Sequence, residues 1–188
     1  MTTRWAPAKK DTLRALATEI LHNYSRGRAF VAVDGLPGAG QAAFADDLAD
    51  ALRELGHAAF RASVEDFLVP VDTGSSPDVG VADPAFAPEL FRRVLIEPFR
   101  LGGSTGWVEA AYDREARRAV EPRWVTGPAD ALLLVDGAGL NEPELAGLWN
   151  YSVWVTADAH RGGLRARATS VVDVSDPEHP RRVFDDAC

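Results

Sequence analysis

The residues best suited to chemistry lie in a glycine-rich segment that follows a short apolar run. The segment extends from Val31 to Ala43 and reads VAVDGLPGAGQAA. Gly35 and Gly40 have the spacing of the two glycines in GxxxxGK[ST], the pattern of a phosphate-binding loop. In such a loop, backbone N–H groups of the turn and of the following helix N-terminus bind an anion. The spacing therefore predicts phosphate chemistry at this turn.

Two positions of the segment depart from that pattern. Gln41 stands where the pattern has lysine, and Ala42 stands where it has serine or threonine. The lysine places a full charge on the β- and γ-phosphates, and the hydroxyl ligates Mg²⁺. Glutamine offers only a neutral amide, and alanine offers no polar atom. Two interpretations stay open: a phosphate loop, or a strand–turn–helix corner without a ligand.

The elements that must position this loop are indicated by hydrophobic periodicity. Short apolar runs alternate with segments of helical period, and this alternation predicts an α/β fold with a mostly parallel sheet and helices on both faces. Ligands bind at the carboxyl ends of the strands in such sheets, which directs attention to residues 34–40, 65–67 and 136–139. The predicted strands are 29–34, 57–64, 131–135, 152–156 and 170–174; the predicted helices are 11–25, 41–55, 87–99 and 157–168; residues 70–85 are predicted to form a long loop.

Composition favours a single globular domain over residues 1–188, with polar tails at 1–10 and 176–188. The chain is 46% hydrophobic and 26% charged, and its net charge is −8. That balance argues against nucleic acid and anionic membranes as partners. We expect a cytoplasmic protein, because neither a signal-peptide core nor a membrane-spanning run is visible. Cys188 is the only cysteine, which excludes an intrachain disulfide, and Lys9 and Lys10 are the only lysines.

Five segments, in order, resemble the uridine kinase and phosphoribulokinase group of P-loop kinases, especially short bacterial uridine-kinase-like proteins. The resemblance extends from about Leu13 to Arg182. It is carried by VAVDGLPGAG at 31–40, SVEDF at 63–67 (similar to S-x-D-D-F), YDR at 112–114 (similar to Y/F-D-H), LLLVDG at 132–137 (similar to a strand that ends in D-G or E-G) and VDVSDP at 172–177 (similar to V-D-N-T-D-P). The resemblance implies a three-layer P-loop kinase fold and ATP-dependent phosphorylation of a nucleoside or other small molecule, with Mg²⁺.

The same resemblance implies roles for individual residues. Glu65 would be the catalytic base, Asp136 would hold the metal, and Tyr112, Arg114 and Arg118 would bind the substrate. Each carboxylate also has a structural interpretation: Glu65 as a solvated strand-end group, Asp136 as a turn residue, and Asp34 as a cap of the loop rather than a metal ligand. The arginines could simply solvate a surface. The residues implied for cofactor binding are Gly35, Gly38, Ala39, Gly40, Gln41 and Ala42.

The departures from the family pattern affect the residues that the resemblance implies for catalysis and ligand binding. Besides Gln41 and Ala42, Glu65 replaces an aspartate and Arg114 replaces a histidine, and the arginine-bearing lid near 161–167 is deleted or much shortened. Removing one preorganised donor costs about 10²–10³ in rate. We therefore expect a weak or inactive kinase that at most binds a nucleotide, phosphate or sulfate. Two alternatives stay open: a non-catalytic interaction module, such as a homodimer, and an active kinase that replaces the lysine by one of Arg61, Arg114, Arg118, Arg161 or Arg165.

Overall fold

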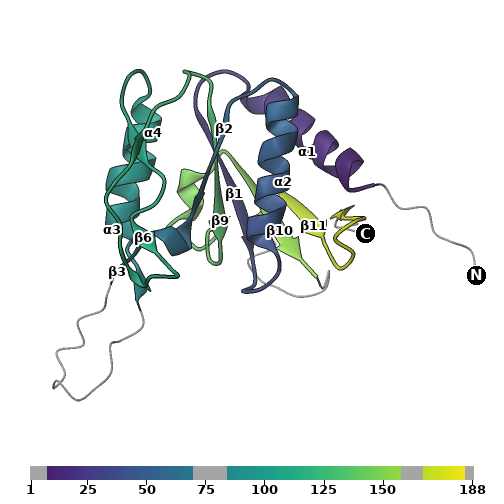
Figure 1. Ribbon diagram of the computed structural model, residues 1–188. Helices are drawn as coiled ribbons and strands as arrows, with labels where there is room; N and C mark the ends of the chain where they lie inside the picture. Colours follow the sequence, from purple (N-terminus) through teal and green to yellow (C-terminus); the bar gives the residue numbers. More distant parts are fainter. Residues whose placement is uncertain (1–7, 70–83, 158–166, 185–188) are drawn as a thin grey trace, which may run out of the picture. The chain divides into compact units, whose positions relative to one another are not determined.

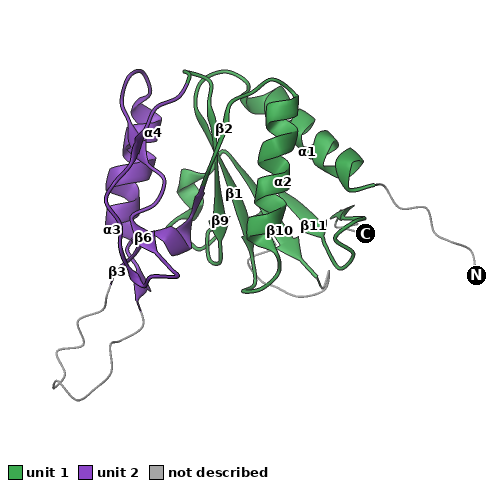
Figure 2. Cartoon of the chain, viewed as in Figure 1, with its two compact units in different colours: residues 1–61, 128–188 green, residues 62–127 purple. Residues whose placement is uncertain are grey.

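The computed structural model describes residues 8–69, 84–157 and 167–184 (Figure 1). These residues divide into two compact units, 1–61 with 128–188 (unit 1) and 62–127 (unit 2), as Figure 2 shows. Within the described residues, no helix combines the length and apolarity that crossing a membrane requires.

A six-stranded sheet is the centre of the α/β fold. Its strand order is β12-β11-β10-β1-β9-β2. β1 lies parallel to both β9 and β10, β10 lies parallel to β11, and β12 is antiparallel to β11. The strands are β1 (Ala29–Gly35), β2 (Ala59–Ser63), β9 (Leu132–Gly137), β10 (Tyr151–Thr156), β11 (Ser170–Asp173) and β12 (Arg181–Val183).

Two helices cover one face of this sheet. α1 (Lys9–Tyr24) and α2 (Gln41–Glu54) pack on each other, and their apolar stripes meet alternate residues of the central strands. The side chains that face them from β1 are Ala29, Val31 and Val33, as the two-residue period of a strand requires. Every residue of β1, β9 and β10 is buried, which explains why these strands read as continuous apolar runs.

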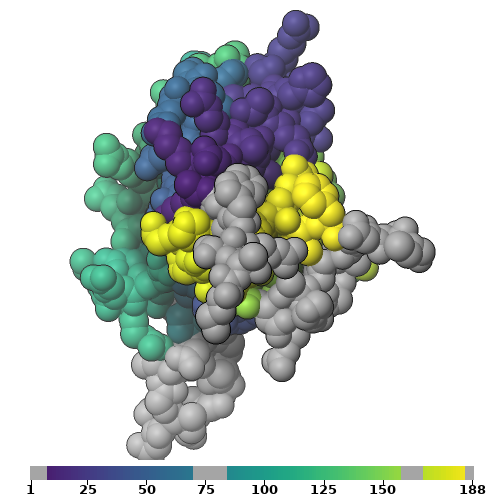
Figure 3. Space-filling view, turned by 90° about the vertical axis from the view of Figure 1, so that its right-hand side faces the viewer, coloured from purple at the N-terminus to yellow at the C-terminus, as the bar shows by residue number. Residues whose placement is uncertain are grey.

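The first turn of α1 and the segment that precedes β12 are held together by hydrogen bonds. The backbone N–H of Lys9 donates to the carbonyl of Glu178, and the Thr12 hydroxyl donates to the carbonyl of Pro180. In Figure 3 the purple surface of the N-terminal helix adjoins the yellow surface of the C-terminal segment. β12 is a strand within the region 176–188, which the sequence predicts to be a polar tail.

A partly buried polar cluster strengthens this junction. The Tyr151 hydroxyl donates to Glu19 Oε1 at 2.7 Å, and the Arg182 guanidinium donates to both oxygens of Glu19. Burial, and then the hydrogen bond to Glu19, raise the pKa of Tyr151 to about 12. The hydrogen bond from Arg182 lowers the pKa of Glu19 below its usual value. The cluster links α1, β10 and β12.

Unit 2 has its own small apolar core. Phe67 and Phe91 pack edge-to-face with ring centroids 5.2 Å apart, and Phe99 packs on Trp107 at 5.0 Å. Its elements are η1 (Val64–Asp66), β3 (Leu68–Val69), β4 (Ala85–Phe86), α3 (Pro88–Phe91), a π-helical turn η2 (Arg92–Ile96), α4 (Glu97–Leu101), β5 (Trp107–Val108), β6 (Tyr112–Asp113), β7 (Arg118–Ala119) and β8 (Trp124–Val125).

Several expectations about elements differ from the structure. The helix predicted over 87–99 is interrupted by η2, because Pro98 has no N–H to donate to the carbonyl of Val94. The predicted tail at 1–10 contains the start of α1, at Lys9. Most of the predicted loop 70–85 and of the predicted helix 157–168 lies outside the described residues.

Candidate functional site

The glycine-rich segment forms the turn between β1 and α2, as the sequence predicts. Gly38 and Gly40 have φ values of +81° and +87°, in the left-handed region that favours glycine. Gly40 is the N-cap of α2, and no side chain caps this helix end. The geometry is that of a strand, a tight loop and a helix N-terminus, which together can bind an anion. It brings together all six predicted cofactor-binding residues: Gly35, Gly38, Ala39, Gly40, Gln41 and Ala42.

Gly35 is required at the end of β1 by a close approach of the backbone. A Cβ atom at this position would lie 2.5 Å from the carbonyl oxygen of Val155 in β10 and 3.2 Å from Cγ and Nε2 of Gln41. Any side chain at this position would therefore push the loop away from the sheet.

Gln41 turns its side chain back onto the loop. Its Nε2 donates to the carbonyl of Leu36 at 2.8 Å, and the residue is only 7% exposed. The amide thus satisfies a loop carbonyl and packs against Gly35. Ala42, the next residue, is exposed and presents only a methyl group. The loop keeps its backbone shape without either of the side chains that the motif normally supplies.

Asp34 caps the loop, as one of the two interpretations of this residue predicts. Its Oδ1 accepts hydrogen bonds from the backbone N–H groups of Gly35 at 2.8 Å and Gly139 at 2.9 Å. Its Oδ2 accepts from the N–H of Asn141 at 2.7 Å. The residue is fully buried. This carboxylate therefore ties the end of β1 to the segment after β9.

Asp136 lies at the end of β9, beside β1. In the register of the two strands Val33 pairs with Asp136, so both carboxyl ends meet at one edge of the sheet. Oδ1 of Asp136 accepts a hydrogen bond from Nη2 of Arg61 at 2.8 Å. The metal role of Asp136 stays a prediction, and the structure adds a cationic neighbour that the sequence did not indicate.

A cavity of about 300 Å³ lies beside the loop within unit 1. Such a volume is at the lower end for small-molecule sites. An ion pair at its edge joins Lys9 Nζ to Asp47 Oδ2 at 2.5 Å. Its lining is otherwise mostly apolar and comes from the loop, α2 and the segments after β10 and β11: Gly38, Ala39, Gly40, Ala43, Phe44, Ala157, Val174, Pro177 and Pro180.

Unit 2 carries a separate group of charged side chains. Glu65, in the turn that follows β2, forms an ion pair with Arg114, whose Nε also lies 3.4 Å from Asp66 Oδ1. The Glu65 side chain is 57% exposed. The predicted base and one predicted substrate-binding residue are thus in contact, and the resemblance to S-x-D-D-F and Y/F-D-H identified two segments that meet in space.

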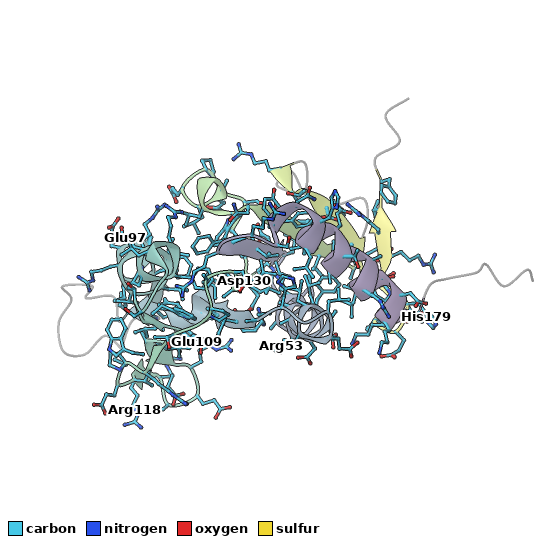
Figure 4. The ribbon with its side chains drawn as sticks, turned by 90° about the horizontal axis from the view of Figure 1, so that it is seen from above. Arg53, Glu97, Glu109, Arg118, Asp130 and His179 are labelled. Atoms are coloured by element: carbon cyan, nitrogen blue, oxygen red, sulfur yellow. The ribbon has the colours of Figure 1, made fainter. Side chains whose placement is uncertain are left out.

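The other two predicted substrate-binding residues have different surroundings. Tyr112 is buried at the start of the β6–β7 hairpin, where it pairs with Ala119. Arg118 is exposed on the same hairpin, where Figure 4 labels it. Neither observation decides a substrate role, so both stay predictions.

Three of the five arginines that could replace the missing lysine lie among the described residues. Arg61 donates hydrogen bonds to carboxylates and backbone carbonyls, Arg114 forms an ion pair with Glu65, and Arg118 is exposed. Arg161 and Arg165 lie outside the described residues, as does most of the region expected to hold the lid. Sequence reasoning did not foresee Lys9 beside the loop, because only the packing of α1 on α2 brings it there.

Solved structures show what this arrangement is similar to. A protein from Bacillus stearothermophilus solved as a possible uridine kinase aligns with a TM-score of 0.62 and 21% identity, over 77% of this chain and 79% of that one. A proposed fructose transport system kinase from Silicibacter sp. TM1040 aligns with a TM-score of 0.59 and 24% identity, over 76% and 73% of the two chains. The chain has the fold of these two proteins. No protein-family model matches it, and no curated protein does.

The likeness confirms the α/β, P-loop-kinase-like fold that the resemblance implied. At these identities it concerns the fold alone.

Proposed function

We propose that this chain binds a phosphate-bearing ligand, a nucleotide in the first place, and that its phosphotransferase activity is weak or absent. The observation that supports binding is the loop at 35–42, with its left-handed glycines and an α2 N-terminus that no side chain caps. The cavity beside it adds mostly apolar walls against which a nucleoside could pack.

Weak activity follows from the side chains at the positions where charge must be stabilised. The Gln41 amide is used on the carbonyl of Leu36, and Ala42 has no oxygen for a metal. Phosphoryl transfer depends on positioning and charge stabilisation, so the loss of both groups lowers the rate of transfer. Such losses are not additive, but each is worth about 10²–10³.

Thermal unfolding with pyrophosphate and with ATP tests the binding. A ligand at 100 times its Kd stabilises the folded state by about 2.7 kcal/mol, which raises the Tm by roughly 5–10 °C for a chain of this size. The absence of any shift with either ligand would refute a phosphate site and favour an interaction module.

Two glycines provide a matched pair of variants for locating the ligand. Gly40 is the N-cap of α2 and Gly56 follows its C-cap, Leu55; both glycines have φ of +87°, and a Cβ at either would meet nothing within 4 Å. Gly40→Ala and Gly56→Ala should therefore lower the free energy of unfolding by similar amounts. Only Gly40→Ala should weaken pyrophosphate binding. Equal effects of both variants on binding would place the ligand elsewhere.

Activity is tested with a panel of nucleosides and sugars, with ATP as the donor. The double variant Gln41→Lys, Ala42→Ser supplies the two missing groups and should bind pyrophosphate at least about tenfold more tightly, the effect of one added charge-assisted contact. Turnover by the wild-type chain at ordinary kinase rates of about 1–100 s⁻¹ would contradict the proposal.

A further inference from the structure

The fold implies a magnesium ion next to the phosphate loop, but the side chains at this position do not fit one. Ala42 offers a methyl group where a hydroxyl is needed. Both oxygens of Asp34 are bound by backbone N–H groups. Oδ1 of Asp136 is bound by Arg61. Mg²⁺ needs oxygen ligands in near-octahedral geometry. A magnesium ion beside a phosphate uses one or two protein oxygens, and the carboxylate oxygens named here already accept hydrogen bonds.

The guanidinium of Arg61 lies where β2, β9 and the first turns of α2 come together. Its Nη2 donates to Asp136 Oδ1 at 2.8 Å and to the carbonyl of Ala42 at 3.2 Å. Its Nε donates to Asp46 Oδ1 at 2.9 Å. The side chain is 17% exposed, and that of Asp136 is 7% exposed. One cation therefore contacts the Asp136 carboxylate and the backbone carbonyl of Ala42, the residue that lacks the metal-ligating hydroxyl of the motif.

We propose that Arg61 takes the place of the divalent cation, so that the loop binds a metal-free di- or triphosphate group. This inference rests on the proposed function, because it concerns the ligand of the same loop. A guanidinium stays charged at every relevant pH and is fixed here by its hydrogen bonds. A metal ion at Asp136 would have to displace the guanidinium from Oδ1 or lie beside it, and either arrangement places two positive charges together at a largely buried carboxylate.

Arg61 offsets negative charge that lies close to the loop. Asp46 and Asp136 are both close to the start of α2, and either carboxylate alone would repel a phosphate. Arg61 offsets part of this negative charge without an added ion. The phosphate anion would then bind to backbone N–H groups of the loop. The ion pairs of Arg61 would limit the repulsion between this anion and the two carboxylates.

Calorimetric titration of the wild-type chain with pyrophosphate, in EDTA and in millimolar Mg²⁺, tests the inference. Binding should persist in EDTA and should not become tighter in Mg²⁺; because Mg²⁺ chelates free pyrophosphate and the loop takes the metal-free anion, the apparent affinity should be lower in Mg²⁺. Binding that requires Mg²⁺ would overturn the inference and leave the proposed function standing. Absence of binding in both solutions would overturn both. Mn²⁺ titrations with and without pyrophosphate, followed by electron paramagnetic resonance, should show no site at Asp136.

Variants separate a counter-ion from a metal ligand. Asp136→Asn removes one negative charge, so it should tighten pyrophosphate binding in EDTA. If Asp136 were instead a metal ligand, this substitution would weaken pyrophosphate binding in Mg²⁺. Arg61→Gln should weaken binding about fivefold, the size expected for one partly screened unit charge. Arg61→Lys keeps the charge and should retain most of the affinity, which guards against a variant that fails to fold.

Arg53 provides the matched control for Arg61. It also links α2 to β2, through a hydrogen bond to the carbonyl of Ala59, and it pairs with Asp50 within α2. Arg53 lies near the carboxyl end of this helix, Gln41–Glu54, opposite the loop. Arg53→Gln makes the same charge change far from the loop and should leave the pyrophosphate Kd within about twofold of the wild-type value. Equal effects of Arg53→Gln and Arg61→Gln would show that net charge alone is responsible and would overturn the inference.

Discussion

Replacing Asp34 by asparagine should destabilise the whole of unit 1. The carboxylate is fully buried and accepts three backbone hydrogen bonds, at 2.7, 2.8 and 2.9 Å. An amide keeps one oxygen for the donors at Oδ1 but turns an NH₂ group toward the N–H of Asn141. One charge-assisted hydrogen bond is lost, worth about 1.5–3 kcal/mol, and one buried donor is left unsatisfied, at about 1–3 kcal/mol. We expect a total loss of about 3 kcal/mol.

Urea unfolding followed by circular dichroism measures this loss, and the Tm should fall by roughly 6–12 °C. Asp50→Asn is the control, because that carboxylate is 72% exposed and pairs with Arg53 on the helix surface. Its effect should stay below about 1 kcal/mol. If Asp34→Asn also cost less than about 1 kcal/mol, the argument that these hydrogen bonds hold the loop to the sheet would be refuted.

Two further changes test other parts of the fold. Gly35→Ala would place a Cβ 2.5 Å from the carbonyl oxygen of Val155, so we expect a loss of about 1–3 kcal/mol in urea unfolding, and a stable variant would contradict the packing described. Glu19→Gln tests acid stability: because Arg182 lowers the pKa of Glu19, the ionised pair stabilises the fold above the usual carboxyl pKa and is lost as pH falls through the lowered value. The stability difference between wild type and Glu19→Gln should therefore shrink between about pH 5 and pH 3, and a constant difference would argue against the ion pair.

The sequence was sufficient to predict the framework of the site. The apolar run at 29–34 and the glycines at 35, 38 and 40 have local causes, namely burial on both faces and left-handed backbone, and such causes are visible in a single segment. The predicted strand at 131–135 was also found, two residues longer at its carboxyl end.

The surroundings of the charged groups could not be predicted in the same way. The partners of Arg61, at positions 46 and 136, are separated from it by 15 and 75 residues, and no local pattern encodes such pairs. The same holds for Lys9, which reaches the loop cavity only through the packing of α1 on α2. The helical turn η2 was missed although its cause, Pro98, was visible in the sequence.

The position of β1 in the sheet has a consequence for how the chain reaches its native state. β1 lies between β9 and β10, which are made about 100 residues later, so its pairing requires closure of a long loop. At a synthesis rate of about 5–20 residues per second, the segment AFVAVDG waits roughly 5–20 s for a partner strand. During this interval this apolar strand is available to chaperones and to other chains, and the contacts of Asp34 with the segment after β9 and of Gly35 with β10 cannot yet form.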